Sequence, residues 1–276
     1  MYDDTDSTIS EPHKIRIFGA PFDGTVSFRT GTRLGPAAIR DVSDGVEIYS
    51  PVLDADLTQV SYADAGDLDL SSSNVQEVLS TIRKAADDCV TDNCIPFLLG
   101  GEHLVSLPVI EAVHTKYPDL VVVQLDAHAD QRADYMGSPL SHACVIRRVS
   151  EFLGQQNIRQ IGIRSGTREE YALMREHGTL TTFRDEDLTK LREWIGDRPL
   201  YLTVDLDVFD PASFPGTGTP EPGGIDWWTF QRFIQAINGC NIVGLDAVEL
   251  APQLDTSDCS SVLAAKCVRE MLLLFS

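Results

Sequence analysis

Short runs of apolar and β-branched residues alternate along this chain with longer segments of helical periodicity, and this alternation limits the fold more than any other feature. Several of the runs, such as Val121–Val123 and Tyr201–Val204, are apolar or β-branched at consecutive positions. Strands of that kind are typical of a parallel sheet with both faces covered. We therefore expect an α/β fold of three layers, with the sheet between two layers of helices.

The expected strands and helices follow one another without a repeat, a low-complexity linker or a break in composition over the 276 residues. One domain is therefore expected, at residues 13–276, preceded by a flexible acidic arm at residues 1–12. The strands are predicted at Ile15–Gly19, Phe97–Leu99, Leu120–Leu125, Ile158–Ile163, Pro199–Val204 and Ile242–Leu245. The helices include Ala37–Val42, Leu104–Lys116, Ser141–Leu153, Arg168–His177, Asp226–Ile237 and Ser257–Leu274.

Composition excludes several classes of function. No run of 18 apolar residues and no signal peptide occurs, so a cytoplasmic protein without a membrane span is expected. The formal net charge of −20 argues against nucleic acid or anionic lipid as a partner. It is compatible with a cationic substrate, although general solubility or adaptation to a salty cytoplasm is the favoured explanation of the charge. The six cysteines are scattered, which indicates reduced, packed thiols.

The strongest local feature is Asp126-Ala127-His128-Ala129-Asp130, directly after an apolar run. Alternate residues of a strand point to the same face, so the two acids and the histidine are expected to project together. Sites in parallel α/β sheets form at the carboxyl ends of strands. An exposed Asp-rich turn is the alternative, but the preceding VVVQL argues for burial. Burying such a set is costly unless a cation neutralises it, so this segment predicts a metal site.

Two further strand ends repeat this pattern. Asp205 and Asp207 follow the run Leu202–Val204, and His103 follows a pair of glycines in Gly100–Glu102. Two imidazoles and four carboxylates form an oxygen-rich set that suits Mn²⁺ better than a thiolate zinc site. Their number favours two ions rather than one. The predicted metal ligands are His103, Asp126, His128, Asp130, Asp205 and Asp207.

These residues, with longer segments around them, resemble the ureohydrolase family of arginases, agmatinases and their relatives. The resemblance runs through Phe28–Arg40, GGEH, DAHAD, Ser138–Arg148 and Gly244–Pro252, and is greatest to bacterial agmatinases. It implies a three-layer α/β/α domain with a mostly parallel eight-stranded sheet, two Mn²⁺ per subunit, and a homotrimer or homohexamer. It also implies the ligand sets: Asp126 and Asp205 bridging, His103 and Asp130 on one ion, His128 and Asp207 on the other.

The resemblance implies hydrolysis of a guanidino group to urea and an amine. Glu249 would pair with the guanidinium, although a carboxylate at a strand end can also be an ordinary surface acid. His142 would transfer a proton to the leaving amine, although a histidine near a helix start is often structural. The ligand Asp130 is counted with them among the candidate catalytic groups.

Substrate choice depends on the residues that hold the substrate's tail. Asp134 favours a cationic tail such as that of agmatine, whereas Arg132 favours a carboxylate such as that of guanidinobutyrate. Thr217 and Thr219 belong to a loop that lines the pocket in this family. Agmatine is the leading substrate; the alternatives are guanidinobutyrate, N1-aminopropylagmatine, formimidoylglutamate, or a non-catalytic relative. The remaining histidines are interpreted as surface or packing residues: His13, His114 and His177.

Overall fold

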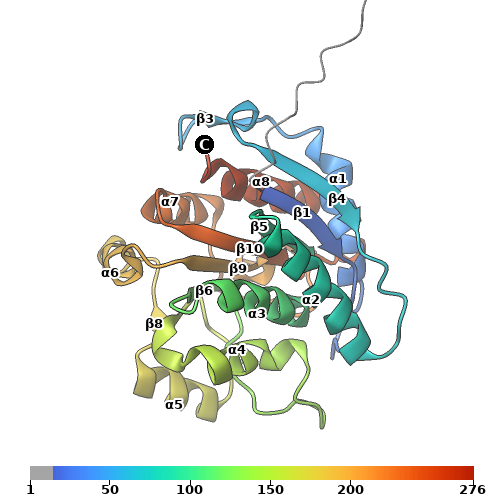
Figure 1. The fold of residues 1–276 in the computed structure, drawn as a ribbon, viewed down its shortest axis with the longest axis vertical. Coiled ribbons are helices and arrows are strands. Elements are labelled where there is room, and N and C mark those ends of the chain that lie inside the picture. The colour runs from blue at the N-terminus through green and yellow to red at the C-terminus, as the bar shows by residue number, and fades with distance from the viewer. Residues whose placement is uncertain (1–14) are drawn as a thin grey trace, which may run out of the picture.

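A computed structural model describes residues 15–276, in which eight parallel strands form one sheet between two layers of helices (Figure 1). The expected α/β fold is thus confirmed, and the predicted arm at residues 1–12 lies outside the described residues. In spatial order the strands are β4 (Tyr62–Asp67), β1 (Ile15–Ala20), β5 (Ile95–Gly100), β10 (Ile242–Val248), β9 (Leu200–Asp205), β6 (Val121–Leu125), β7 (Ile158–Ile161) and β8 (Leu180–Thr181).

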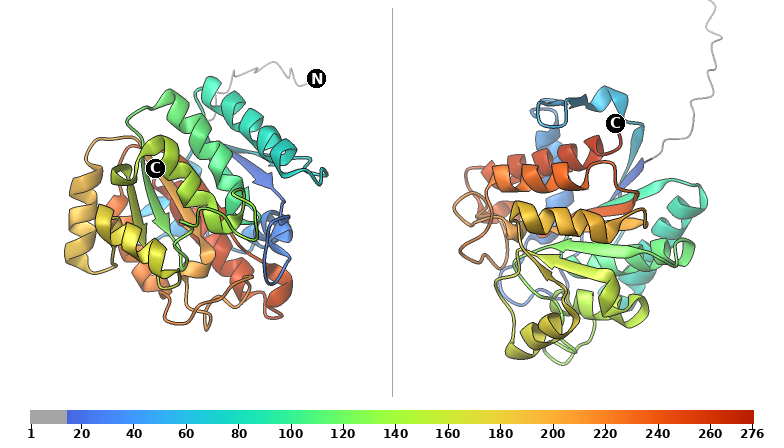
Figure 2. Two further views of the ribbon diagram at one scale, coloured as in Figure 1. Left: turned by 90° about the horizontal axis from the view of Figure 1, so that it is seen from below. Right: turned by 90° about the vertical axis from the view of Figure 1, so that its left-hand side faces the viewer.

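Helices cover both faces of the sheet (Figure 2). Two apolar clusters, one on each face, hold the layers together. On one face pack α2 (Val75–Thr91), α3 (Ser106–Lys116) and α4 (Val145–Leu153); on the other pack α1 (Gly35–Ser43), α6 (Asp185–Ile195), α7 (Trp227–Ile237) and α8 (Cys259–Leu273). The chain also contains α5 (Arg168–His177) and a small antiparallel pair, β2 (Tyr49–Ser50) and β3 (Ala55–Asp56).

The central strands form where most positions of the sequence are apolar or β-branched. All residues of β6 and β9 are buried, as expected for strands covered on both faces. The sequence analysis did not single out the two edge strands, β4 and β8. The first is largely polar, with the sequence YADAGD and all six of its residues partly or wholly exposed to solvent, and the second has only two residues. A strand with one neighbour needs fewer apolar residues, and so leaves a weaker signal.

The strand order places four carboxyl ends side by side in the middle of the sheet. After β5 the chain crosses to β6, and the two positions left between them are filled later by β9 and β10. Such a reversal of strand order opens a crevice at the carboxyl ends, where ligands bind in open α/β sheets. The loops that follow these four strands carry the predicted metal ligands and Glu249.

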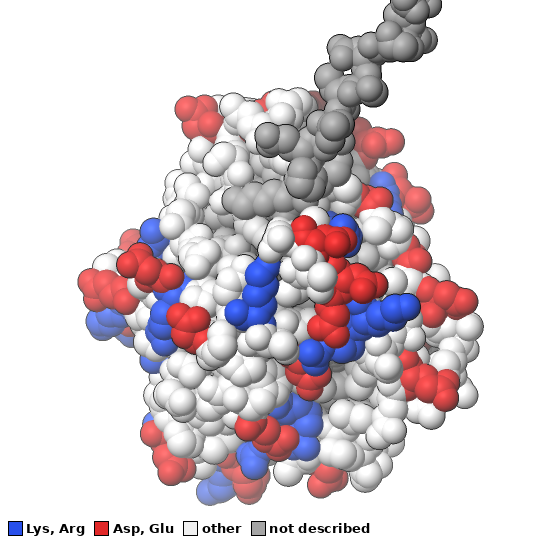
Figure 3. Space-filling model, in the orientation of Figure 1, with Lys and Arg blue, Asp and Glu red and all other residues white. Residues whose placement is uncertain are grey.

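Within residues 15–276, no helix combines the length and apolar character needed to span a bilayer. Acidic side chains lie among basic ones on the face seen in Figure 3. Four of the six cysteines are buried: Cys89, Cys94, Cys144 and Cys267. His114 packs against Phe152, with ring centroids 5.3 Å apart, and His177 is exposed, while His13 lies outside the described residues.

Glycine is required where β5 turns into the next helix. A Cβ at Gly101 would lie 2.0 Å from the backbone oxygen of Phe22, closer than real contacts allow. This close approach lets Gly101 N–H donate to the oxygen of Ala20 and Glu102 N–H donate to that of Phe22, at 2.9 and 2.8 Å. The loop before His103 is thereby tied to the end of β1.

We expect Gly101→Ala to reduce the free energy of unfolding by about 1–3 kcal/mol, because the added methyl group overlaps backbone that cannot move aside cheaply. Gly45→Ala is the matched control, since a Cβ there meets only one atom, at 3.4 Å. Chemical denaturation of both variants measures the difference. Equal stability of the two variants would show that the 101 loop tolerates a side chain.

Candidate metal centre

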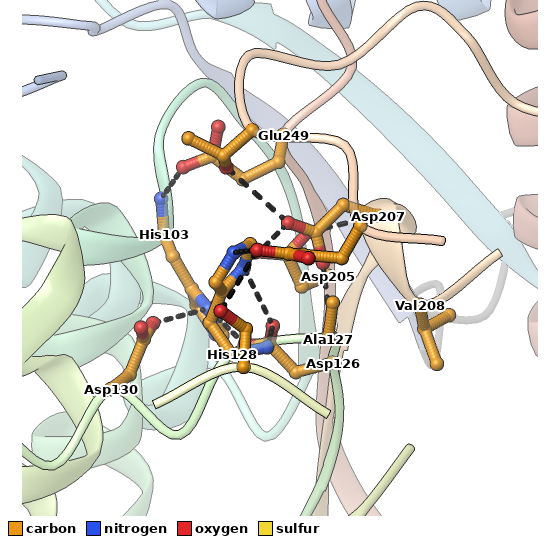
Figure 4. Close-up of polar contacts among 12 residues, drawn as sticks. His103, Asp126, Ala127, His128, Asp130, Asp205, Asp207, Val208 and Glu249 are labelled. Carbon is orange, nitrogen blue, oxygen red and sulfur yellow. Dashed lines mark hydrogen bonds and ion pairs between the residues drawn. The ribbon is translucent and has the colours of Figure 1, made fainter. Parts of the chain in front are cut away.

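Side chains from four loops point toward one another at the carboxyl end of the sheet (Figure 4). They follow β5, β6, β9 and β10, which are neighbours in the sheet although far apart in the chain. Two groups of three residues bring potential metal ligands within 4.8 Å of one another, and Asp126 belongs to both. The first group is His103, Asp126 and Asp205; the second is Asp126, His128 and Asp207.

The first group surrounds the Nδ1 atom of His103. Carboxylate oxygens of Asp126, Asp130 and Asp205 lie 3.1, 3.2 and 3.3 Å from it. Asp130 is therefore adjacent to this group through His103. All four side chains are buried from solvent.

The second group surrounds Nδ1 of His128. Its distances to Oδ2 of Asp207 and Oδ1 of Asp126 are 2.8 and 3.7 Å. Asp126 thus directs Oδ2 to the first group and Oδ1 to the second. Asp205 belongs to the first group only, whereas the family resemblance implied that it bridges the two ions.

The DAHAD segment reaches this geometry by a turn, not by continued strand alternation. The strand β6 ends at Leu125, one residue before Asp126. The Asp126 carboxylate then accepts the backbone N–H of His128 at 2.6 Å, which folds the segment back. Asp130 has a φ of 51°, a left-handed conformation that is uncommon outside glycine and costs free energy. The side chains nevertheless converge, as expected from the sequence.

A buried hydrogen-bond chain assigns the protons of His103. Thr203 donates its hydroxyl hydrogen to Asp246 at 2.6 Å, so its Oγ1 accepts from Nε2–H of His103 at 2.8 Å. Nδ1 of the neutral ring is then an unprotonated lone pair. It is buried without a hydrogen-bond partner and faces three carboxylates. A bound cation removes this repulsion, so the residues fit a metal ion.

The electrostatics of the carboxylates agree with that fit. Burial, together with the charges of Asp207 and Asp126, raises the pKa of Asp205 well above its ordinary value. Burial and Asp126 likewise raise the pKa of Asp130 to about 7. The protein therefore holds these groups where their ionised forms need positive charge nearby.

Glu249 stands on the wall of a cavity of about 220 Å³ that also exposes His128, Asp130 and Asp205. Its φ is 68°, so a second acidic residue of the site has a left-handed backbone. Oε1 accepts the backbone N–H of His103 at 2.8 Å. Burial and the neighbouring Glu102 raise the pKa of Glu249 well above its usual range.

His142 lines the same cavity in the first turn of a 3₁₀ helix, His142–Cys144, that leads into α4. Ser141 caps this turn by accepting the N–H of Ala143. Burial lowers the pKa of the imidazole to about 4, so the ring is neutral at pH 7. Desolvation disfavours the charged form of the ring.

The tail-binding candidates do not all reach the cavity. Arg132 lines it, with its guanidinium 4.8 Å from the Tyr135 ring centroid and 3.9 Å from Glu170. Asp134 is exposed and is not part of the lining.

Of the two threonines in the loop after β9, one lines the cavity and the other does not. Thr219 lines the cavity and its hydroxyl lies 3.5 Å from Asp207. Thr217 is buried outside it, and its backbone oxygen accepts from Arg29.

Several residues that build the site carried no signal in the sequence analysis. They are Thr25 and Ser27 beside His142, Glu102 in the GGEH segment, and the Thr203–Asp246 pair behind His103. Two of them had a clue in the sequence. Glu102 directly precedes the predicted ligand His103, and Asp246 lies in the segment Gly244–Pro252 together with Glu249.

Comparison with known proteins agrees with this geometry. A model of the Arginase family matches residues 13–274. Agmatinase from Bacillus cereus is 46% identical over 95% of this chain and 92% of its own, and agmatinase from Bacillus subtilis is 44% identical over 94% and 91%. The solved structure of a putative agmatinase from Clostridium difficile is similar with a TM-score of 0.92 and 42% identity, over 96% of this chain and 97% of its own.

We expect Thr203→Val to weaken metal affinity about 10–100-fold, because the acceptor that orients His103 is lost. Titration with Mn²⁺ against a competing chelator measures the affinity. Thr203→Ser keeps the hydroxyl and should bind metal like the wild type. Unchanged affinity in the valine variant would show that the Asp246–Thr203–His103 chain has no bearing on metal binding.

Proposed function

The chain belongs to the arginase family and is a ureohydrolase, and we propose that it hydrolyses agmatine to putrescine and urea with two Mn²⁺ ions. Metal dependence is supported by one observation: Nδ1 of His103 has no hydrogen-bond partner and faces three carboxylates. Two of these carboxylates, Asp130 and Asp205, line the same cavity as Glu249. Agmatine is supported by the bacterial agmatinases that match almost the whole chain.

His103, Asp126, Asp130 and Asp205 would hold one ion, and Asp126, His128 and Asp207 the other. Oxygen and imidazole ligands of this kind are compatible with Mn²⁺. Divalent ions held there lower the pKa of water enough to supply a nucleophile at neutral pH.

Glu249 would bind and orient the guanidinium. The carbon of a guanidinium is a poor electrophile because resonance spreads its charge, so orientation contributes strongly to the rate. Oε1 of Glu249 is fixed by the N–H of His103, and the cavity is the open side of the carboxylate. A guanidinium placed against it is held by a charge-assisted hydrogen bond over the metal ligands.

His142 would transfer a proton to the departing amine. Its neutral ring keeps one nitrogen free to accept a proton and release it again. Ser27 lies 3.4 Å from Nε2, and both residues line the cavity. Asp130 lines the cavity beside them and completes the set of candidate catalytic groups.

A second substrate, 4-guanidinobutyrate, is favoured by one observation. Arg132 lines the cavity and carries a positive charge, whereas Asp134 is exposed and does not line it. The cation suits the carboxylate tail of guanidinobutyrate and repels the ammonium of agmatine. Glu170, 3.9 Å from Arg132, offsets part of that repulsion.

The proposed function also includes a domain organisation, a location in the cell and an oligomeric state. Residues 13–276 would form a single catalytic domain, because the family match spans residues 13–274 and one eight-stranded sheet runs through the described residues. We also propose a cytoplasmic location for it. We propose a homotrimer or homohexamer, as the resemblance to the family implies.

Purified enzyme reconstituted with Mn²⁺ is expected to hydrolyse agmatine with a higher kcat/KM than guanidinobutyrate, aminopropylagmatine, formimidoylglutamate or arginine. A colorimetric urea assay follows four of these reactions, and formamide detection follows the formimino compound. A higher kcat/KM for guanidinobutyrate would assign Arg132 the role of tail ligand. No turnover of any of these compounds, with metal bound, would overturn the enzymatic proposal.

Glu249→Gln should lower kcat/KM for agmatine by about 10–100-fold, because a hydrogen bond to a charged group contributes about 1.5–3 kcal/mol. Metal content, measured by elemental analysis, should stay at the wild-type value. Glu193→Gln, an exposed position on α6, is the matched control and should behave like the wild type. Wild-type kinetics in Glu249→Gln would exclude the carboxylate charge from guanidinium binding.

A further inference from the structure

We propose that the side chain of Gln160 positions two metal ligands, Asp126 and Asp130, and thereby sets the affinity for the ion beside His103. This inference rests on the metal-dependent part of the proposed function. Gln160 lies on β7 and is fully buried. It reaches both ligands through other residues, so it is a positioning residue.

Gln160 belongs to a chain of four glutamine side chains that ends at Asp126. Its Nε2 donates to Oε1 of Gln124, on β6, at 2.7 Å. Its Oε1 accepts from Nε2 of Gln131, in the loop after the DAHAD segment, at 3.0 Å. Gln131 and Gln155 donate to one another at 3.1 and 2.9 Å. The chain therefore runs from the half-buried Gln155 inward to the metal ligand, through three buried amides.

The first arm of this chain leads to Asp126. Nε2 of Gln124 donates to Oδ2 of Asp126 at 2.6 Å and to the backbone oxygen of His128 at 3.3 Å. Oδ2 is the carboxylate oxygen that lies 3.1 Å from Nδ1 of His103. Because Gln160 holds the other end of the Gln124 amide, it fixes the direction from which Oδ2 is bound.

The second arm holds Asp130 from both sides. Its left-handed backbone, with a φ of 51°, persists only where surrounding contacts maintain it. The residue before it, Ala129, accepts Nε2–H of Gln160 at 2.8 Å through its backbone oxygen. The residue after it, Gln131, donates its side-chain amide to the same glutamine. One amide thus clamps both neighbours of a ligand that lies 3.2 Å from Nδ1 of His103.

The orientation of these amides follows from acceptors that cannot donate. The backbone oxygens of His128 and Ala129 require the NH₂ groups of Gln124 and Gln160 to face them. A flipped Gln160 would place its oxygen 2.8 Å from that of Ala129. The Thr179 hydroxyl, 3.2 Å from Oε1 of Gln160, donates to it in the same arrangement. Both hydrogens and both lone pairs of the Gln160 amide are then used, whatever the protonation of any acid.

Both arms converge on the group around His103. In the second group, Asp207 is held from another strand end, where its Oδ1 accepts the N–H of Ala127 at 3.1 Å. Asp126 offers that group its other oxygen, Oδ1, which accepts the N–H of His128 at 2.6 Å. Loss of the Gln160 amide should therefore weaken the ion beside His103 more than the ion beside His128.

Gln160→Met keeps the length of the side chain and removes its hydrogen bonds. We expect the affinity for Mn²⁺ beside His103 to fall about 10–100-fold relative to that beside His128, as for loss of a group that orients metal ligands. Gln131→Met removes one bond of the Asp130 arm and should weaken the same ion. Gln155→Met is the matched control, because it leaves every bond of Gln160 in place, and it should bind both ions like the wild type.

Equilibrium dialysis against Mn²⁺ gives the two affinities of each folded variant. The manganese anomalous signal of half-saturated crystals shows which site has emptied. A general loss of stability would not change the ratio of the two affinities. Equal weakening at both sites, or wild-type affinity beside His103 in Gln160→Met, would overturn the inference. If Gln160→Met does not fold, the same two outcomes in Gln131→Met decide it.

These measurements need no substrate. A wild type that binds both ions but leaves agmatine intact would contradict the proposed substrate, and the ratio of affinities would still decide the role of Gln160. A wild type that binds no Mn²⁺ would contradict the proposed metal dependence and this inference together.

Discussion

The structure depends on one electrostatic constraint, the burial of four carboxylates and two imidazoles at the end of one sheet. Such a set repels itself unless cations occupy the space between its members. The Nδ1 of His103 shows this most clearly, since it has no hydrogen-bond partner and carboxylate oxygens of three aspartates lie within 3.3 Å of it. The left-handed backbone conformation of Asp130 and Glu249 adds a further free-energy cost at the same site.

The fold supplies the positions that this constraint requires. Because β5, β10, β9 and β6 are neighbours, residues separated by almost 150 positions in the chain reach the same point. The buried chain from Asp246 through Thr203 orients His103 from below, inside the sheet. The loop before this histidine packs against the backbone after β1 so closely at Gly101 that no side chain fits there. The packing of the central sheet therefore also determines where the ligands lie.

The sequence predicted the three layers and brought out six residues that the structure places together, because apolar strands and the acids after them leave a periodic signal. It failed where a role depends on contacts between distant segments. Thr25 and Thr203 are ordinary threonines in the sequence, and only the fold brings them to His142 and His103. Asp134 was chosen by proximity to DAHAD, yet its side chain faces solvent. The neutral state of His142 likewise follows from burial, which spacing does not reveal.

The central claim is that these six residues hold two cations with Asp126 between them. Crystals grown with Mn²⁺, with diffraction recorded on both sides of the manganese absorption edge, test it directly. The account predicts two anomalous peaks, one bonded to Nδ1 of His103 and one to Nδ1 of His128, each in contact with a different oxygen of Asp126. A single peak, or peaks away from these atoms, in crystals saturated with metal would contradict it.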